Sequence, residues 1–245
     1  MSHYDLLITN GRLLDADTGR DEISDIAISG DKIERIDQNI DPSNSNDTID
    51  ASGHWIIPGM IDTHVHVANA ADLGRIRGLG LQMVAAAGAT TVIDLGGSMD
   101  ALTAGIDARG SGVNVGSLGY LKPGETVPEG RLSPDMILEI VGTALEAGSL
   151  GIKLWGGYYP FTPDETSRFI STANNLGAYV AYHVGTTETG SRLDGLREVP
   201  SLLGSSGRVH VAHINAYTRG SILPVEEEIQ EALQIIDELR EQVVS

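Results

Sequence analysis

The chain has 245 residues, enough for one large core or for a barrel with a small appended unit. It contains no cysteine, which excludes disulfides, thiolate metal ligands and a cysteine nucleophile. The formal charge of −18 disfavours nucleic acid as a partner, because its phosphates would be repelled. No apolar run is long enough for a membrane span and no signal peptide is recognisable, so we expect a cytoplasmic protein without a membrane partner.

Residues 1–57 have the pattern of short strands and tight turns. Apolar residues cluster or alternate over residues 6–8, 26–28 and 32–36, and turn pairs that contain glycine separate these runs. This pattern predicts a small β-sandwich-like unit, which is too short to be stable without packing on something larger.

Residues 58–245 alternate between strand and helix. The helix starts are marked by Ser133-Pro134 and Thr162-Pro163-Asp164-Glu165, and Pro224 opens a last helix. Its apolar stripe would be Val225, Ile229, Leu233, Ile236 and Leu239. Six alternating units predict an α/β fold, an incomplete (β/α)8 TIM-type barrel, and no G-x-G-x-x-G motif supports a doubly wound sheet. The expected strands are residues 56–61, 90–95, 113–118, 150–155, 179–184 and 209–214.

Two histidines end the first of these strands. Alternate residues of a strand share a face, so His64 and His66 point together while Val65 takes the other side. At the carboxyl end of a barrel strand that face is the mouth where active sites form, and two imidazoles there can chelate one divalent metal. A pair of this kind also arises by chance, so the motif alone is moderate evidence.

Lys153 lies in the middle of the fourth strand, between Ile152 and Leu154. If those two face the helices, the lysine points into the barrel, where a bare ammonium is costly and its pKa falls. A neutral amine there can react with carbon dioxide to give an anionic carbamate ligand. The alternative is a structural lysine that extends to solvent or pairs with Asp94.

Two further histidines stand at strand ends. His183 ends the fifth strand, and His213 lies in the sixth, on the predicted inner face with Val209, Val211 and Asn215. His210 is three positions away, so we expect it to face the helices and to have a structural role. His3 and His54 fall in the small β unit or at its exit, and we expect them to be structural too.

These motifs resemble the amidohydrolase superfamily. The stretch Pro58-Gly-Met-Ile-Asp-Thr-His-Val-His66, the run Gly-Ile-Lys-Leu-Trp155, the histidine of strand five and Val-Ala-His213 are similar to the branch of hydantoinases, dihydroorotases and N-acyl-D-amino-acid deacylases. The small β unit before the first strand also matches that branch.

The resemblance implies a site with two divalent metal ions, with zinc expected. His64 and His66 would bind one metal, His183 and His213 the other, and a carbamate on Lys153 would bridge them. Tyr158 stands at the spacing of the hydantoinase tyrosine that hydrogen-bonds the oxyanion, with Tyr159 as the fallback, and Asp94 and Asn215 are weaker candidates for the mouth. The substrate would be a small cyclic amide or N-acyl amino acid, cleaved by metal-activated water.

Two alternatives to amide hydrolysis stay open. The chain could be a non-catalytic metal-binding or assembly protein on the same scaffold, or an esterase or phosphotriesterase that uses the same metals. In the family the catalytic base is an aspartate that ends strand eight, and only six units are recognisable here. We therefore expect a C-terminally truncated chain with little activity alone, and a homo-oligomer or pairing with the missing segment.

Overall fold

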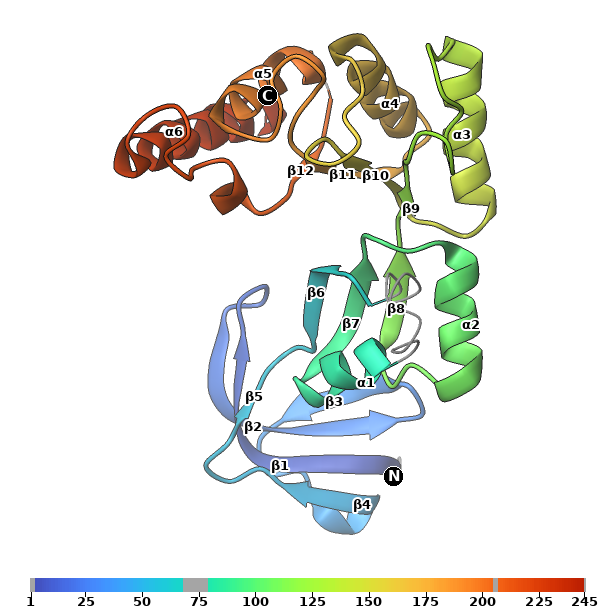
Figure 1. Ribbon diagram of the computed structural model, residues 1–245. Coiled ribbons are helices and arrows are strands. Elements are labelled where there is room, and N and C mark those ends of the chain that lie inside the picture. Colours follow the sequence, from blue (N-terminus) through green and yellow to red (C-terminus); the bar gives the residue numbers. More distant parts are fainter. Residues whose placement is uncertain (1–2, 68–78, 205–206, 245) are drawn as a thin grey trace. The chain divides into compact units, whose positions relative to one another are not determined.

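The computed structural model describes residues 3–67, 79–204 and 207–244 (Figure 1). By its internal contacts the chain divides into two units, Met1–Gly59 and Met60–Ser245. The sequence suggested a boundary after residue 57, in the extended segment that leads out of the first unit.

The N-terminal unit is one mixed β-sheet in the order β3-β2-β1-β4, with β5 also paired to β1. β1 pairs antiparallel with β2 on one edge, and in parallel with β4 and then β5 on the other. Because one long strand serves three partners, the short strands form a single sheet and not the predicted sandwich-like pair of sheets. The elements are β1 (Tyr4–Asp15), β2 (Arg20–Ser29), β3 (Lys32–Asp37), the 3-10 helix η1 (Pro42–Asn44), β4 (Ser45–Asp50) and β5 (Trp55–Ile56).

A buried carboxylate organises this sheet. Asp25 is 5% exposed, and its two oxygens accept the backbone N–H groups of Asn10 and Ile40, each at 2.8 Å. Asn10 has a φ of 61° at the register shift in β1, a conformation that asparagine tolerates better than most residues. The charge of Asp25 is thus met by two donors, as a buried carboxylate requires.

The C-terminal unit alternates strands and helices, and all its strand pairings are parallel. They form a three-stranded sheet, β6-β7-β8, and a four-stranded sheet, β12-β11-β10-β9. The strands are β6 (Met60–Val65), β7 (Ala89–Asp94), β8 (Asn114–Ser117), β9 (Gly119–Tyr120), β10 (Gly151–Trp155), β11 (Tyr179–His183) and β12 (His210–Val211). The helices are α1 (Leu79–Ala86), α2 (Met99–Arg109), α3 (Pro134–Glu146), α4 (Pro163–Asn175), α5 (Leu193–Leu203), the 3-10 helix η3 (Ile214–Ala216) and α6 (Val225–Val244).

The third expected strand, residues 113–118, corresponds to β8, and after Leu118 the chain continues as the short strand β9. β8 pairs with β7 and β9 pairs with β10, and the N–H of Leu150 donates to Ser117 O at 2.8 Å. The strands therefore follow one another in sequence order, as parallel β/α units predict. The break at Leu118 divides these strands between two sheets, so the parallel β/α units are present but the predicted incomplete barrel is not shown among the described residues.

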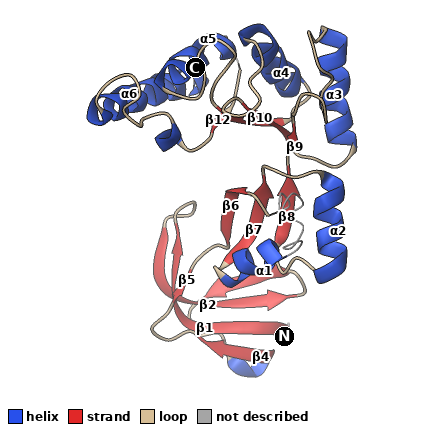
Figure 2. Cartoon of the chain, in the orientation of Figure 1, coloured by secondary structure: helices blue, strands red, loops and turns tan. Residues whose placement is uncertain are grey.

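The main core lies between the β10–β11 sheet and helices α3 to α6, which stand along one face of it (Figures 1 and 2). Ile152 and Leu154 of β10 and Val180 and Tyr182 of β11 point into this core. The intervening residues Lys153, Ala181 and His183 therefore take the opposite face of the sheet.

The helix starts follow the signals in the sequence. Ser133 caps α3 by accepting the N–H of Met136, with Pro134 at the first turn. Thr162 and Glu165 form the predicted capping box of α4, and Glu165 also accepts the N–H of Leu132 at 3.0 Å. That carboxylate joins the helix start to the loop that precedes α3.

The last helix follows its predicted stripe in part. Leu239 is buried and Ile236 packs against the core, together with Ala232 and Ile235, whereas Val225, Ile229 and Leu233 are 42%, 42% and 54% exposed. Within the described part of the chain, no helix combines the length and apolarity that a bilayer crossing needs.

Candidate metal centre

His64 and His66 stand together at the end of β6, as the strand alternation predicts. Val65 between them is buried in a core with residues of α1 and α2, and the two imidazoles take the other side. Their Nε2 atoms are 3.2 Å apart. Two imidazole nitrogens on one tetrahedral zinc ion lie about 3.3 Å apart, given bonds of about 2.0–2.1 Å. The pair therefore has the spacing of a chelating site, and without metal it can form an N–H···N hydrogen bond.

Lys153 is buried on the same side of the sheet as the histidines. The residue is 2% exposed, and its Nζ has no hydrogen-bond partner among the described residues. The expected alternative, a hydrogen bond to Asp94, is therefore not formed; Asp94 instead accepts the N–H groups of Val67 and Gly96. Desolvation lowers the pKa of Lys153 to about 8. A buried amine without a hydrogen-bond partner needs a further chemical group that can bond to it.

His183 and His213 approach each other across the ends of β11 and β12. Their ring centroids are 4.5 Å apart, and those of His64 and His213 are 5.1 Å apart. Nε2 of His183 lies 2.7 Å from Oγ of Ser191, in the loop after β11. That contact fixes the ring and leaves Nδ1 as its second nitrogen.

The prediction for the sixth strand is wrong in its geometry. β12 covers only His210 and Val211, and His213 follows in a left-handed conformation with a φ of 34°. Val209 and Val211 pack against the helix-side core, so His210 faces inward, with its ring 6.3 Å from that of His64. A regular strand would have placed His213 opposite His210, but the turn after Val211 brings both rings to one side.

Four of the five predicted ligands line one cavity of about 420 Å³, which is formed by His66, Lys153, Trp155, Tyr158, His183, His213, Asn215, Ala216 and Arg219. His64, the fifth, contacts it through its neighbours His66 and His213. Asn215 is among the lining residues of this cavity, and Asp94 is not.

Tyr158 is 66% exposed at this cavity, with its ring 5.4 Å from that of His183. Tyr159, the fallback, lies beneath Lys122, whose Nζ is 5.4 Å from the ring centroid. Of these two tyrosines, Tyr158 is the one whose ring contacts the histidine cluster.

The environment keeps the imidazoles neutral. Burial, with smaller contributions from Lys153 and neighbouring histidines, lowers the pKa of His64 and that of His183 to about 4. Burial also lowers the pKa values of His66 and His213. Neutral imidazole is the form that binds metal, so these side chains are ready as donors near neutral pH.

The histidine donors suit a metal ion in their type and in their proximity. They do not, however, form a complete coordination shell. Within residues 3–67, 79–204 and 207–244, no three His, Asp or Glu side chains are arranged to hold one ion together. Lysine is not one of those residue types. A carbamate on Lys153 would add an oxygen ligand beside the two nitrogens of His64 and His66.

Sequence reasoning missed Ser191 and Tyr217. The Tyr217 hydroxyl donates to Ala212 O and accepts from Val184 N, each at 2.8 Å, and so ties the end of β11 to the end of β12. The His183–Ser191 contact depends on how a loop folds back. Neither residue has a spacing or alternation signal that could have identified it.

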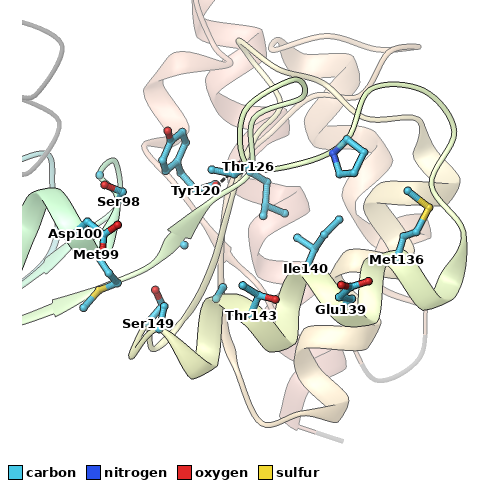
Figure 3. A pocket seen from close by; sticks show the side chains of 16 residues that line it. Ser98, Met99, Asp100, Tyr120, Thr126, Met136, Glu139, Ile140, Thr143 and Ser149 are labelled. Atoms are coloured by element: carbon cyan, nitrogen blue, oxygen red, sulfur yellow. Dashed lines mark hydrogen bonds between the residues drawn. The ribbon is translucent and has the colours of Figure 1, made fainter.

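A second cavity, of about 450 Å³, lies between the start of α2, β9 and α3 (Figure 3). Met99, Leu121, Met136 and Ile140 make its wall apolar, and none of the predicted ligands reaches it.

Known proteins match the chain in sequence and in fold. No family model matches. Over 61 residues, 25% of the chain, it is 49% identical to a dihydroorotase from Lactococcus lactis subsp. lactis (strain IL1403) and 46% identical to one from Staphylococcus aureus (strain Mu50 / ATCC 700699). The matched segment is 14% of each relative's length.

Solved structures match nearly the whole chain. An L-hydantoinase from Arthrobacter aurescens gives a TM-score of 0.59 at 21% identity, covering 96% of this chain and 51% of its own. An N-acyl-D-glutamate deacylase from Bordetella bronchiseptica, complexed with zinc and a phosphonate inhibitor, gives 0.65 at 18% identity, covering 98% and 57%. The chain thus spans about half the length of these structures.

These matches show two similarities. A quarter of the chain is similar in sequence to dihydroorotases, and the fold is similar to that of hydantoinase, N-acyl-D-glutamate deacylase and D-aminoacylase structures.

Proposed function

We propose that this chain binds divalent metal through His64, His66, Lys153, His183 and His213 and hydrolyses amide C–N bonds. One juxtaposition carries the proposal. Two imidazole nitrogens stand 3.2 Å apart, on the side of the sheets where a buried amine has no hydrogen-bond partner among the described residues. Neutral imidazole donors suit zinc, and because the chain has no cysteine, oxygen would complete the shell.

Lys153 supplies the oxygen ligand in this proposal. Its lowered pKa, about 8, leaves a larger neutral fraction near pH 7 than an exposed lysine has. The neutral Nζ adds to the carbon of carbon dioxide, an N–C bond forms, and one proton is released to water. The resulting carbamate is anionic and presents two oxygens to the histidine side of the sheet.

The remaining residues orient the substrate. Divalent metal at these ligands would lower the pKa of water and polarise the amide carbonyl. The Tyr158 hydroxyl borders the cavity, where it can donate a hydrogen bond to the carbonyl oxygen as negative charge develops there.

Arg219 favours a substrate that carries a carboxylate. It lines the same cavity, and none of the described lining residues is acidic. A guanidinium recognises a carboxylate by paired hydrogen bonds, so an N-acyl amino acid or a cyclic amide with a carboxylate fits better than a neutral amide.

Zinc uptake tests the metal site. We expect the parent chain to bind zinc in a competition titration and His64→Ala/His66→Ala to lose the tight site. His54→Ala, just before β5 in the N-terminal unit, removes a histidine outside the predicted ligand set and should bind as the parent does. Equal zinc affinity in all three proteins would contradict the ligand assignment.

Binding of a substrate mimic tests the reaction class. Phosphonate analogues of N-acyl amino acids imitate the tetrahedral geometry of amide hydrolysis and bind tightly where that transition state is stabilised. We expect calorimetric binding to the zinc-loaded chain and weaker binding to Arg219→Gln, with Arg208→Gln as the control at another cavity. Failure of the zinc-loaded parent to bind any such analogue would contradict an amide substrate.

A further inference from the structure

The main chain on both sides of His66 is tied to the end of β7. Val65 O accepts the N–H of Leu95 at 2.8 Å, which extends the pairing of β6 with β7. Val67 N donates to Oδ2 of Asp94 at 2.6 Å. His66 lies between these two anchors, so its backbone cannot shift without breaking one of them.

The His66 ring packs against Gly96, whose backbone N–H is bonded to the same Asp94 carboxylate. Oδ1 of Asp94 accepts the N–H of Gly96 at 2.8 Å, and the Asp94 side chain is fully buried. A Cβ on Gly96 would lie 2.3 Å from Nδ1 of His66, closer than real contacts allow. With the Nδ1 edge against Gly96, the Nε2 edge is turned to the Nε2 of His64.

We propose that Asp94 is a positioning residue that, together with Gly96, sets His66 for metal binding. The inference rests on the proposed metal site. Asp94 accepts at least two backbone N–H groups, one after β6 and one after its own strand, and so joins the two turns between which the ring is held. A carboxylate that accepts two N–H groups forms strong, directional bonds.

Asp25 provides a matched control. It too is a buried carboxylate that accepts two backbone N–H groups, from Asn10 and Ile40. It belongs to the N-terminal unit, whereas the histidine cluster belongs to the other. Asp25→Asn removes an equivalent pair of charge-assisted bonds without removing any contact of His66.

The experiment compares the parent chain with Asp94→Asn, Gly96→Ala and Asp25→Asn. Zinc affinity is measured by competition with a chromophoric chelator, and the ligand geometry by the visible spectrum of the cobalt(II)-loaded protein. Residues that orient metal ligands typically contribute about 10–100-fold to affinity. We expect Asp94→Asn and Gly96→Ala to weaken zinc binding by about that factor and to change the cobalt spectrum. Asp25→Asn should leave both within about twofold of the parent, even where it lowers the melting temperature.

A metal-free readout accompanies the titration. In ¹⁵N spectra of the imidazoles, the His66 signals should shift in Asp94→Asn and stay in place in Asp25→Asn. A parent chain that binds no zinc would overturn the metal site itself. A parent that binds zinc, with Asp94→Asn no weaker than Asp25→Asn, would overturn the positioning role and leave the site standing. If Asp94→Asn does not fold, Gly96→Ala decides, and parent-like affinity and spectrum in that variant would overturn the role.

Discussion

The two units of this chain differ in whether their buried polar side chains have hydrogen-bond partners. In the N-terminal sheet, the buried carboxylate of Asp25 is met by two backbone donors. In the C-terminal unit, Ser117 Oγ, Lys153 Nζ and Trp155 Nε1 are buried without a hydrogen-bond partner among the described residues. A buried polar atom without a partner costs free energy and is rare in native structures. Among the described residues, the buried side-chain atoms without a partner therefore all belong to the C-terminal unit, whose own packing does not satisfy them.

The largest expected difference between the two units is in how much zinc binding stabilises each of them. Saturation at about 100 times the dissociation constant stabilises a folded protein by about 2.7 kcal/mol. We expect that gain to appear in hydrogen exchange as slower exchange near His64–Val67, residues 94–96 and His183, with residues 4–50 unchanged. Equal protection of both units, or none, would contradict a metal site in the C-terminal unit.

Lys153→Met should uncouple stability from metal binding. Methionine keeps the length of the side chain and removes the unpartnered amine, so the metal-free protein should gain on the order of 1–2 kcal/mol of unfolding free energy. Zinc affinity should fall, because the carbamate can no longer form. Lys32→Met in the exposed β3 strand is the control for both measurements. A destabilised Lys153→Met protein would mean that the amine has a stabilising partner.

How much of this site the sequence predicts depends on how regular each strand is. The alternation around Val65 placed His64 and His66 on one side because β6 continues through Val65. Lys153 was placed inward because Ile152 and Leu154 both pack on the helix side. The same argument failed at β12, which ends at Val211, so the His210 and His213 positions reflect a left-handed turn that no alternation predicts.

The fold shows the same division. The caps of α3 and α4 were predictable because Ser133 and Thr162 act on residues three positions away. The break at Leu118 and the single N-terminal sheet depend on pairing between distant segments, which local patterns do not encode.

Acid should weaken the metal-free C-terminal unit. His64 and His183 have pKa values of about 4 in the folded protein, against about 6.5 in an unfolded chain. Between these values the unfolded chain binds more protons, so stability should fall as the pH drops from about 6.5 to about 4. His64→Ala should flatten this dependence and His54→Ala should not, as measured by urea unfolding at a series of pH values with chelator present. An unchanged slope in His64→Ala would contradict the burial of that ring.

The smallest effect on zinc affinity is expected for a change in helix α4. Thr162→Ala removes the cap of α4 and should cost about 1 kcal/mol of stability. Zinc affinity should stay at the parent value, because Thr162 has no contact with the histidines. A loss of zinc binding in Thr162→Ala would show that stability and the metal site are coupled more broadly than the contacts of His66 indicate.

The central claim is that the unpartnered amine of Lys153 becomes a metal ligand. ¹³C NMR of the zinc-loaded chain in ¹³C-bicarbonate tests it most directly. We predict a carbamate carbon signal in the parent that is absent from Lys153→Met and that disappears when zinc is removed. A zinc-loaded parent without that signal, or a Lys153→Met protein that binds zinc as tightly as the parent, would contradict the account.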